Sequence, residues 1–288
     1  MKSDQSKLYS HVEFITGVTP ARNYRNMESL NKVADYIAVE LKNSGCSVTE
    51  QPFEVQGRTY RNIIGSIGPE NAPRIIVGAH YDVAGDQPGA DDNASAVAGL
   101  LETARLLALK SPELTKRIDF VAYNLEEPPF FSSDDMGSAV HANSLKRDGV
   151  EVEFMVCYEM IGYFSDEPGS QSFPDPSSFE NTYTDTGNFI TVVGIQSYSQ
   201  IAEKLTSLMR DNSDIRVECI VFQSYAGLAG LSDQRNYWAN GYPAVMLTDT
   251  SFLRNHNYHQ VTDTIDTLDF NRMGEVVNGI SGALLALG

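Results

Sequence analysis

The chain has 288 residues, of which 42% are hydrophobic, and it carries a formal net charge of −17. A chain this acidic repels a phosphate backbone, so we exclude nucleic acid as a partner and read the charge as favouring solubility. The three cysteines are too few and too scattered for a disulfide framework or a cysteine-rich metal site, and no apolar run approaches the ~20 residues that cross a bilayer.

The first part of the chain predicts one helix followed by two strands. We treat residues 1–25 as an N-terminal extension. Apolar side chains then recur at helical spacing over residues 30–41, and Gly45 stands where a helix would end. Strand-like runs follow at 47–56 and 59–66, directly after that helix.

Five short apolar runs follow, and helical patterns separate several of them. The runs lie at 74–79, 118–124, 154–158, 189–195 and 244–248. Runs of this length suit strands that are covered on both faces. The helical patterns lie at 92–109, 136–146, 199–210 and 270–287. This alternation predicts an α/β fold with three α/β/α layers and a mixed, mostly parallel central sheet.

One long irregular segment interrupts the pattern at 164–188, which is rich in Ser, Pro, Asp and Gly. Such a segment is either functional or mobile, and we expect it near the site. Nothing in it resembles an interdomain linker, so residues 1–288 are expected to form a single domain. No signal-peptide pattern opens the chain, which predicts a cytoplasmic protein, or a periplasmic or secreted one if a leader has been removed.

Acidic and histidine side chains follow four of the predicted strands, at or beyond the strand ends. They are, in chain order, His80 with Asp82, Glu126 with Glu127, Glu159, and His259. Each alone has an ordinary interpretation, such as a core histidine, a solvated turn or an ion-pair partner. The carboxyl ends of parallel strands lie at one edge of a sheet, so these groups can converge there. Imidazole together with carboxylate suits Zn²⁺ and similar divalent ions.

These residues stand in motifs that resemble the M28 metallopeptidases, a family of co-catalytic zinc aminopeptidases. The motifs are GAHYD at 78–82, PGADDNAS at 88–95, LEE at 125–127, EMIG at 159–162, SD at 232–233, YH at 258–259 and DT at 263–264. Their order and spacing match the family from about residue 25 to the C-terminus. The resemblance implies the zinc-dependent exopeptidase (phosphorylase/hydrolase-like) fold and peptide substrates with a free N-terminus.

The resemblance also implies a metal site and its cofactor. The implied metal ligands are His80, Asp92, Glu127, Glu159 and His259. Of these, Asp92 bridges two ions, His80 and Glu159 complete the first, and the other two complete the second. The implied cofactor is Zn²⁺, with two ions per chain or one, although a mixed nitrogen and oxygen donor set also suits Mn²⁺ or Co²⁺.

Two further residues receive roles from the resemblance. Asp82 orients the His80 imidazole by accepting its other N–H. Glu126 is the general base, which takes a proton from the attacking water and passes it to the leaving amine.

The chain departs from the family pattern at three places. Glu159 stands where the family usually has Asp, and its longer side chain leaves a one-metal site open. Gln234 replaces a His that often follows the Ser-Asp pair, which predicts a changed pocket or changed support of the ligands. Residues 128–131 read Pro-Pro-Phe-Phe instead of a Gly-containing turn, so the prolines stiffen this loop while the phenylalanines join either a substrate pocket or the core.

Three functions remain open at the level of the sequence. The leading one is a zinc aminopeptidase that removes N-terminal residues from peptides. The second is a one-metal acyltransferase of the glutaminyl cyclase kind, which the departure at Glu159 alone encourages. The third is an inactive peptidase-like domain that binds a partner, although all five ligand positions still hold a ligand-capable residue.

Overall fold

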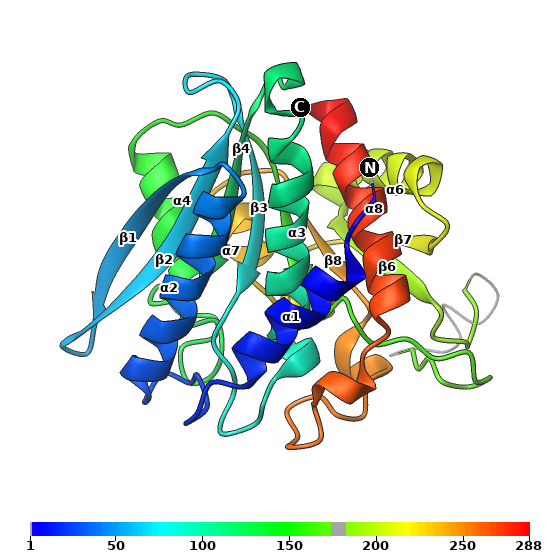
Figure 1. Ribbon diagram of the computed structural model, residues 1–288. Coiled ribbons are helices and arrows are strands. Elements are labelled where there is room, and N and C mark those ends of the chain that lie inside the picture. The colour runs from blue at the N-terminus through cyan, green and yellow to red at the C-terminus, as the bar shows by residue number, and fades with distance from the viewer. Residues whose placement is uncertain (1, 174–182) are drawn as a thin grey trace.

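The computed structural model describes residues 2–173 and 183–288, and within them eight strands form one sheet with helices on both sides (Figure 1). The strands are β1 (Ser47–Val55), β2 (Arg58–Ile67), β3 (Arg74–His80), β4 (Arg117–Tyr123), β5 (Val152–Glu159), β6 (Phe189–Ile195), β7 (Arg216–Phe222) and β8 (Ala244–Thr248). The predicted α/β class with a mixed sheet is confirmed.

The order of the strands is β1-β2-β4-β3-β5-β8-β6-β7. The central pairs β4–β3, β3–β5 and β5–β8 are parallel, as is β6–β7 at one end. The pairs β1–β2, β2–β4 and β6–β8 are antiparallel. The carboxyl ends of β3, β4, β5 and β8 therefore meet at one edge, and the amino end of β6 joins them there.

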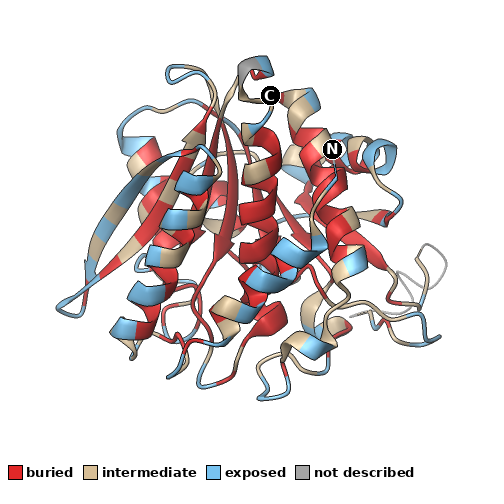
Figure 2. Ribbon diagram, viewed as in Figure 1, coloured by how far each residue is buried: buried red, intermediate tan, exposed pale blue. Residues whose placement is uncertain are grey.

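The central strands are buried on both faces, which explains their continuous apolar sequences. In β3, Val77 packs into one core while its neighbour Ile76 packs into the other. In β5, Val156 and Met155 divide in the same way. Figure 2 shows these strands and the inner sides of the adjoining helices as continuously buried.

Helices cover the two faces unequally. The helices are α1 (Gln5–Thr16), α2 (Met27–Asn43), α3 (Ala96–Ala108), α4 (Gly137–Arg147), α6 (Ser199–Asn212), α7 (Gln234–Ala239) and α8 (Phe270–Leu287). One face packs against the group containing α2, α3, α6 and α8, and the opposite face packs against α4 and α7 (Figure 1). Over β6 the second face meets the 3-10 turn Gly227–Gly230 and a cavity.

The structure corrects four features of the sequence analysis. The segment 1–25, treated as an extension, contains α1, which packs on α3 and α8. Strand β7 and helix α7 were missed, because β7 is a charged edge strand and α7 has only 6 residues. The helix expected from residue 92 begins regularly at Ala96, since Asp92 and Asn93 have non-helical backbone angles.

The structure also bears on a membrane-spanning helix and on the irregular segment 164–188. Among the described residues, no helix combines the length and apolarity that crossing a bilayer requires. Of the segment 164–188, residues 174–182 lie outside the described ranges, whereas Gln171 and Phe173 line the cavity over β6.

Helix α1 generates the first prediction, because its side chains Leu8, Val12 and Ile15 are fully buried. Leu8→Ala removes a buried isobutyl group and leaves a cavity, so it should lower the free energy of unfolding by about 2–5 kcal/mol in urea denaturation. The exposed Glu13 of the same helix supplies the control, and Glu13→Ala should change stability by no more than about 0.5 kcal/mol. Equal effects of the two substitutions would mean that α1 is a loosely attached extension.

Candidate metal centre

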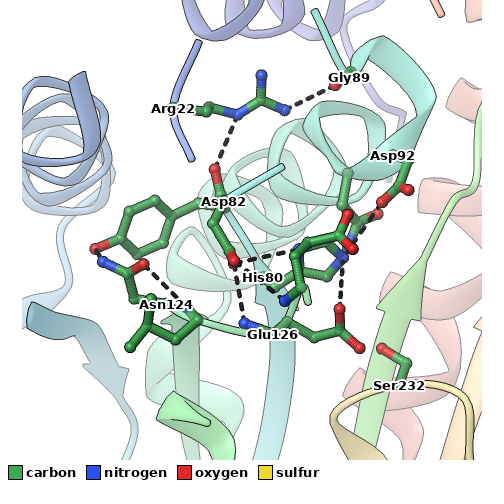
Figure 3. A network of polar contacts seen from close by, with 12 residues as sticks. Arg22, His80, Asp82, Gly89, Asp92, Asn124, Glu126 and Ser232 are labelled. Atoms are coloured by element: carbon green, nitrogen blue, oxygen red, sulfur yellow. Dashed lines mark hydrogen bonds and ion pairs between the residues drawn. The ribbon is translucent and has the colours of Figure 1, made fainter. Parts of the chain in front are cut away.

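The side chains predicted to form a site gather at the edge where the parallel strands end. His80 is the last residue of β3 and Glu159 is the last residue of β5. Glu126 and Glu127 lie in the loop that leaves the end of β4. His259 reaches the same place from the segment after β8. Figure 3 shows His80 between Asp92, Asp82 and Glu126.

The gathered side chains fall into groups of metal-ligand dimensions. His80, Asp92 and Glu159 form one such group, with ligand atoms within 4.8 Å of one another. Asp92, Glu127 and His259 form a second group by the same measure, and His80 with Glu126 and Glu127 forms a third. Asp92 thus belongs to two groups that otherwise share no residue.

The two oxygens of Asp92 face different histidines. Asp92 Oδ1 lies 3.4 Å from His80 Nε2, and Asp92 Oδ2 lies 3.1 Å from His259 Nε2. Glu159 Oε2 is 3.4 Å from His80 Nε2, and Glu127 Oε2 is 3.3 Å from His259 Nε2. This geometry is that of one carboxylate between two ligand pairs.

The protein itself does not balance the negative charge of the carboxylates in this cluster. The ion pairs that its carboxylates make within the described ranges all go to His80 and His259. Burial, and next the charge of Asp92, raise the pKa of Glu127 to about 7. Burial also raises the pKa of Glu126 well above its ordinary value, with Glu159 and Glu127 adding to the rise.

The pKa values of the two histidines are raised as well, which favours their charged form. Burial lowers the pKa of His259, but Asp92 and Glu127 outweigh it and raise that pKa to about 10. Burial likewise opposes protonation of His80, but the charges of Glu159 and Glu126 raise its pKa well above the usual range. Neutral imidazoles and ionised carboxylates become compatible here when a divalent cation supplies the positive charge. The buried Glu127 Oε1, which has no partner among the described residues, adds a free donor atom, so the residues fit such an ion.

Asp82 holds the backbone that carries the two glutamates. Its Oδ1 and Oδ2 accept hydrogen bonds from the backbone N–H groups of Glu126 and Glu127, both at 3.2 Å. Asp82 Oδ1 also lies 3.5 Å from His80 Nδ1, the ring nitrogen that does not face Asp92 (Figure 3), and its role in orienting this ring stays a prediction. The contacts with the two N–H groups were not foreseen.

Asp263 does the same for the loop that carries Asp92. Its two oxygens accept from the backbone N–H groups of Asp91 and Asp92, at 2.9 and 3.1 Å. Both contacts are buried. Asp263 stands in one of the sequence motifs, but its role could not be predicted there, because its partners lie more than 170 residues away in the chain.

Arg22 ties these loops together from the N-terminal segment. Its Nε donates to the Tyr81 carbonyl at 2.8 Å, and its Nη2 donates to the Gly89 carbonyl at 2.7 Å (Figure 3). Its Nη1 donates to the Pro88 carbonyl. Burial lowers the pKa of Arg22 to about 10, against the raising effect of the nearby carboxylates. Arg22 was not predicted as a site residue, since a single arginine in a polar segment carries no signal of its own.

The variant position Glu159 is held by a neighbouring hydroxyl. Ser232 Oγ donates to Glu159 Oε2 at 2.5 Å, and both residues are buried. Gln234, the other variant position, donates to the Ala229 carbonyl at 2.7 Å and so anchors the turn Gly227–Gly230. Gln234 is absent from the metal-ligand groups found in the described ranges.

The remaining histidines lie outside the cluster. His256 is exposed. His141 is buried and its Nδ1 lies 2.6 Å from the Tyr237 hydroxyl, and His11 Nδ1 lies 2.7 Å from the Tyr36 hydroxyl. Both buried rings thus have structural partners.

A cavity of about 340 Å³ opens directly beside the cluster. Asp92, Glu126, Glu127, Glu159 and His259 line one end of it. The rest of the lining is mainly apolar and aromatic. It includes Phe131, Phe173, Phe189, Phe222, Phe252 and Leu231. The two phenylalanines of the Pro-Pro-Phe-Phe loop therefore have different positions. Phe131 lines this cavity, whereas Phe130 is buried in the main core.

Comparison with known proteins adds three findings. A sequence model of peptidase family M28 matches residues 62–284. The chain is 43% identical over 283 residues to the uncharacterized protein YfbL of Escherichia coli (strain K12). This alignment covers 95% of this chain and 85% of that protein. It is 27% identical over 274 residues to a probable leucine aminopeptidase of Arthroderma benhamiae. This second alignment covers 91% of this chain and 67% of that protein.

A solved structure shares the fold at lower identity. Porphyromonas gingivalis glutaminyl cyclase superposes with a TM-score of 0.72 at 19% identity, over 99% of each chain.

Asp263 generates the second prediction, because it holds the Asp92 loop through two backbone N–H groups. Asp263→Asn keeps the shape but replaces one accepting oxygen by an NH₂ donor, so Asp92 should lose its fixed position. We expect zinc affinity to fall about 10- to 100-fold, measured by competition with a chromophoric chelator.

The control for this prediction is Asp269, which also accepts two backbone N–H groups, at the start of α8 and away from the cluster. Asp269→Asn should lower the melting temperature without changing zinc affinity. Unchanged zinc affinity in Asp263→Asn would contradict the anchoring role.

Proposed function

The chain belongs to peptidase family M28, and on that premise we propose that it is a metal-dependent aminopeptidase that releases N-terminal residues from peptides. The observation that carries this proposal is the position of Asp92, shared by two ligand groups with an imidazole in each. Two divalent ions close together repel each other, and a carboxylate between them offsets that repulsion.

The proposal assigns the ligands by their groups. His80, Asp92 and Glu159 would hold one Zn²⁺. Asp92 with Glu127 and His259 would hold the second. Ser232 binds only Oε2 of Glu159, and Oε1 accepts no hydrogen bond from the described residues, so the longer side chain can still serve as a ligand.

Glu126 is the proposed general base. Its backbone is fixed by Asp82, and its side chain lines the cavity at the cluster end. It lies beside the ligand groups but belongs to neither of the two that share Asp92. When bound, the divalent ions supply Lewis acidity towards the scissile carbonyl and the attacking water. Glu126 then takes the proton of that water and delivers it to the leaving amine.

The cavity supports an exopeptidase that prefers a large apolar N-terminal residue. The acidic cluster at one end suits the positive charge of a free α-amine. The apolar lining next to it suits the side chain of the first residue. The relative named as a probable leucine aminopeptidase agrees with this reading.

A glutaminyl cyclase is the second candidate, because a protein of that name shares the fold over its full length. Asp92, Glu127 and His259 form a complete group without the other residues, so a one-metal site is geometrically possible. The second group at His80 and Glu159 argues against it, since those buried side chains would then lack the cation that balances them.

The third prediction tests the proton transfer. Glu126→Gln should lower kcat for aminoacyl arylamides by about 10²–10⁴-fold, because the amide cannot take the proton. Bound zinc should stay at the wild-type level. The exposed Glu151 provides a matched control, and Glu151→Gln should keep the wild-type kcat. Full turnover by Glu126→Gln would rule out this mechanism.

The fourth prediction concerns the number of ions. Elemental analysis of zinc-loaded protein should find two ions per chain, and Glu159→Ala should leave one because only its group is broken. One ion in the wild type, together with cyclisation of peptides that begin with Gln, would favour the cyclase instead.

A further inference from the structure

The cavity beside the cluster is built on an open part of the sheet. Alternate residues of β6 face it, namely Phe189, Thr191 and Val193. Ile220 and Phe222 of β7 continue the same surface. The cavity therefore runs sideways from the candidate metal centre across the face that α4 and α7 leave free.

Strand register joins the two ends of the cavity. Glu159 pairs with Thr248 of β8, and Thr248 pairs in turn with Thr191 of β6. Directly paired residues point to the same face of a sheet. Because neighbouring strands lie ~4.8 Å apart, Thr191 sits roughly 10 Å from Glu159 along that face.

Two buried polar atoms along this cavity have no hydrogen-bond partner among the described residues. At the cluster end this is Glu127 Oε1, which a metal ion would explain. On the β6 wall it is the hydroxyl of Thr191, a fully buried residue. Leaving a buried hydroxyl unpaired is unfavourable, so a ligand that pairs with it is favoured over one that does not.

Two neighbouring polar side chains of this wall, Gln171 and Thr248, already have hydrogen-bond partners. Gln171 donates to the Ser172 carbonyl at 3.0 Å and to the Thr250 hydroxyl at 2.9 Å, and its oxygen accepts from Arg254 at 2.9 Å. The Thr248 hydroxyl accepts from the Thr250 N–H at 3.0 Å. The hydroxyl of Thr191 differs from them, because it is buried and unpaired among the described residues, and a bound molecule can satisfy it.

We propose that Thr191 is a specificity-determining residue, whose hydroxyl forms a hydrogen bond with the phenolic hydroxyl of an N-terminal tyrosine at the β6 wall of the cavity. This inference rests on the proposed function, since that function puts the α-amine and scissile carbonyl at the metal end. The phenol ring then lies among the aromatic side chains of the lining, and its hydroxyl meets Thr191.

The chemistry of the cavity disfavours the other long side chains. A leucine side chain ends at its Cδ atoms, short of the Thr191 hydroxyl. A lysine or arginine needs a free carboxylate there, but Glu218, which pairs with Thr191 across β6 and β7, is already bound by Arg216 at 2.6 Å. Phenylalanine fills the aromatic part of the cavity but leaves the Thr191 hydroxyl unpaired.

The fifth prediction compares tyrosyl and phenylalanyl arylamides that carry the same leaving group. The wild type should favour the tyrosyl substrate in kcat/KM by about fivefold or more, as expected for one buried hydrogen bond. Thr191→Val, which replaces the hydroxyl by a methyl group of similar size, should bring this ratio to about one. Thr191→Ser restores the hydroxyl and should restore the preference.

The matched control is Thr248→Val, which removes an already engaged hydroxyl from the same wall. It should change both substrates by a similar factor and so keep the tyrosine-to-phenylalanine ratio. An equal ratio in the wild type, or a ratio that Thr191→Val leaves unchanged, overturns the inference even when the enzyme is an active aminopeptidase.

A binding measurement separates this inference from the proposed function. Calorimetric titration of the zinc-loaded Glu126→Gln variant with tyrosinamide and phenylalaninamide needs no turnover. Tighter binding of tyrosinamide, lost on adding Thr191→Val, supports the role of Thr191 even where no arylamide is hydrolysed. Equal binding of the two amides contradicts it.

Discussion

The crowding of carboxylates at one buried sheet edge is the constraint on which the rest of the structure depends. The group comprises Asp82, Asp92, Glu126, Glu127 and Glu159, each at most 8% exposed. Two like charges ~4 Å apart repel by about 4 kcal/mol even at an effective dielectric constant of 20. Two histidines cannot offset such a set, so attraction among the side chains alone does not hold the loops together. Backbone hydrogen bonds do so, and the proposed divalent cation would add to them.

Carboxylates of the same chemistry therefore serve two purposes. Asp82 and Asp263 turn both oxygens towards pairs of backbone N–H groups, and this fixes the loops before any ion binds. Asp92 turns its oxygens towards two imidazoles instead. Arg22 completes the frame, because it binds carbonyls of both loops and leaves the carboxylates themselves available to an ion. The N-terminal segment is in this way part of the site's support.

The sequence predicted the parts of the site that short-range pattern controls. Apolar runs ending in His80 or Glu159 identified strands and the edge where they meet, because burial on both faces leaves a clear composition. Arg22 and the anchoring contacts of Asp263 could not be predicted, since their partners are backbone groups that only the tertiary fold brings near. Strand β7 was not predicted because it lies at the edge of the sheet, where Arg216 and Glu218 interrupt its apolar run. The start of α3 was misplaced because backbone contacts, not helical propensity, set the conformation of Asp92.

The reversal of β6 explains why a binding cavity adjoins the candidate metal centre. Since β6 runs antiparallel to β8, its amino end, with Phe189, lies at the edge where β3 and β5 end. The crossover helix of this half of the sheet, α6, covers the opposite face, so the face continuous with Glu159 is left to loops. The candidate ligands thus lie on β3, β5, the β4 exit and the segments before α3 and after β8, whereas the strand residues of the cavity wall lie mainly on β6 and β7. Because the two sets of residues stand on separate strands of one rigid sheet, substitutions in the wall can change which side chain is accepted without moving the ligands.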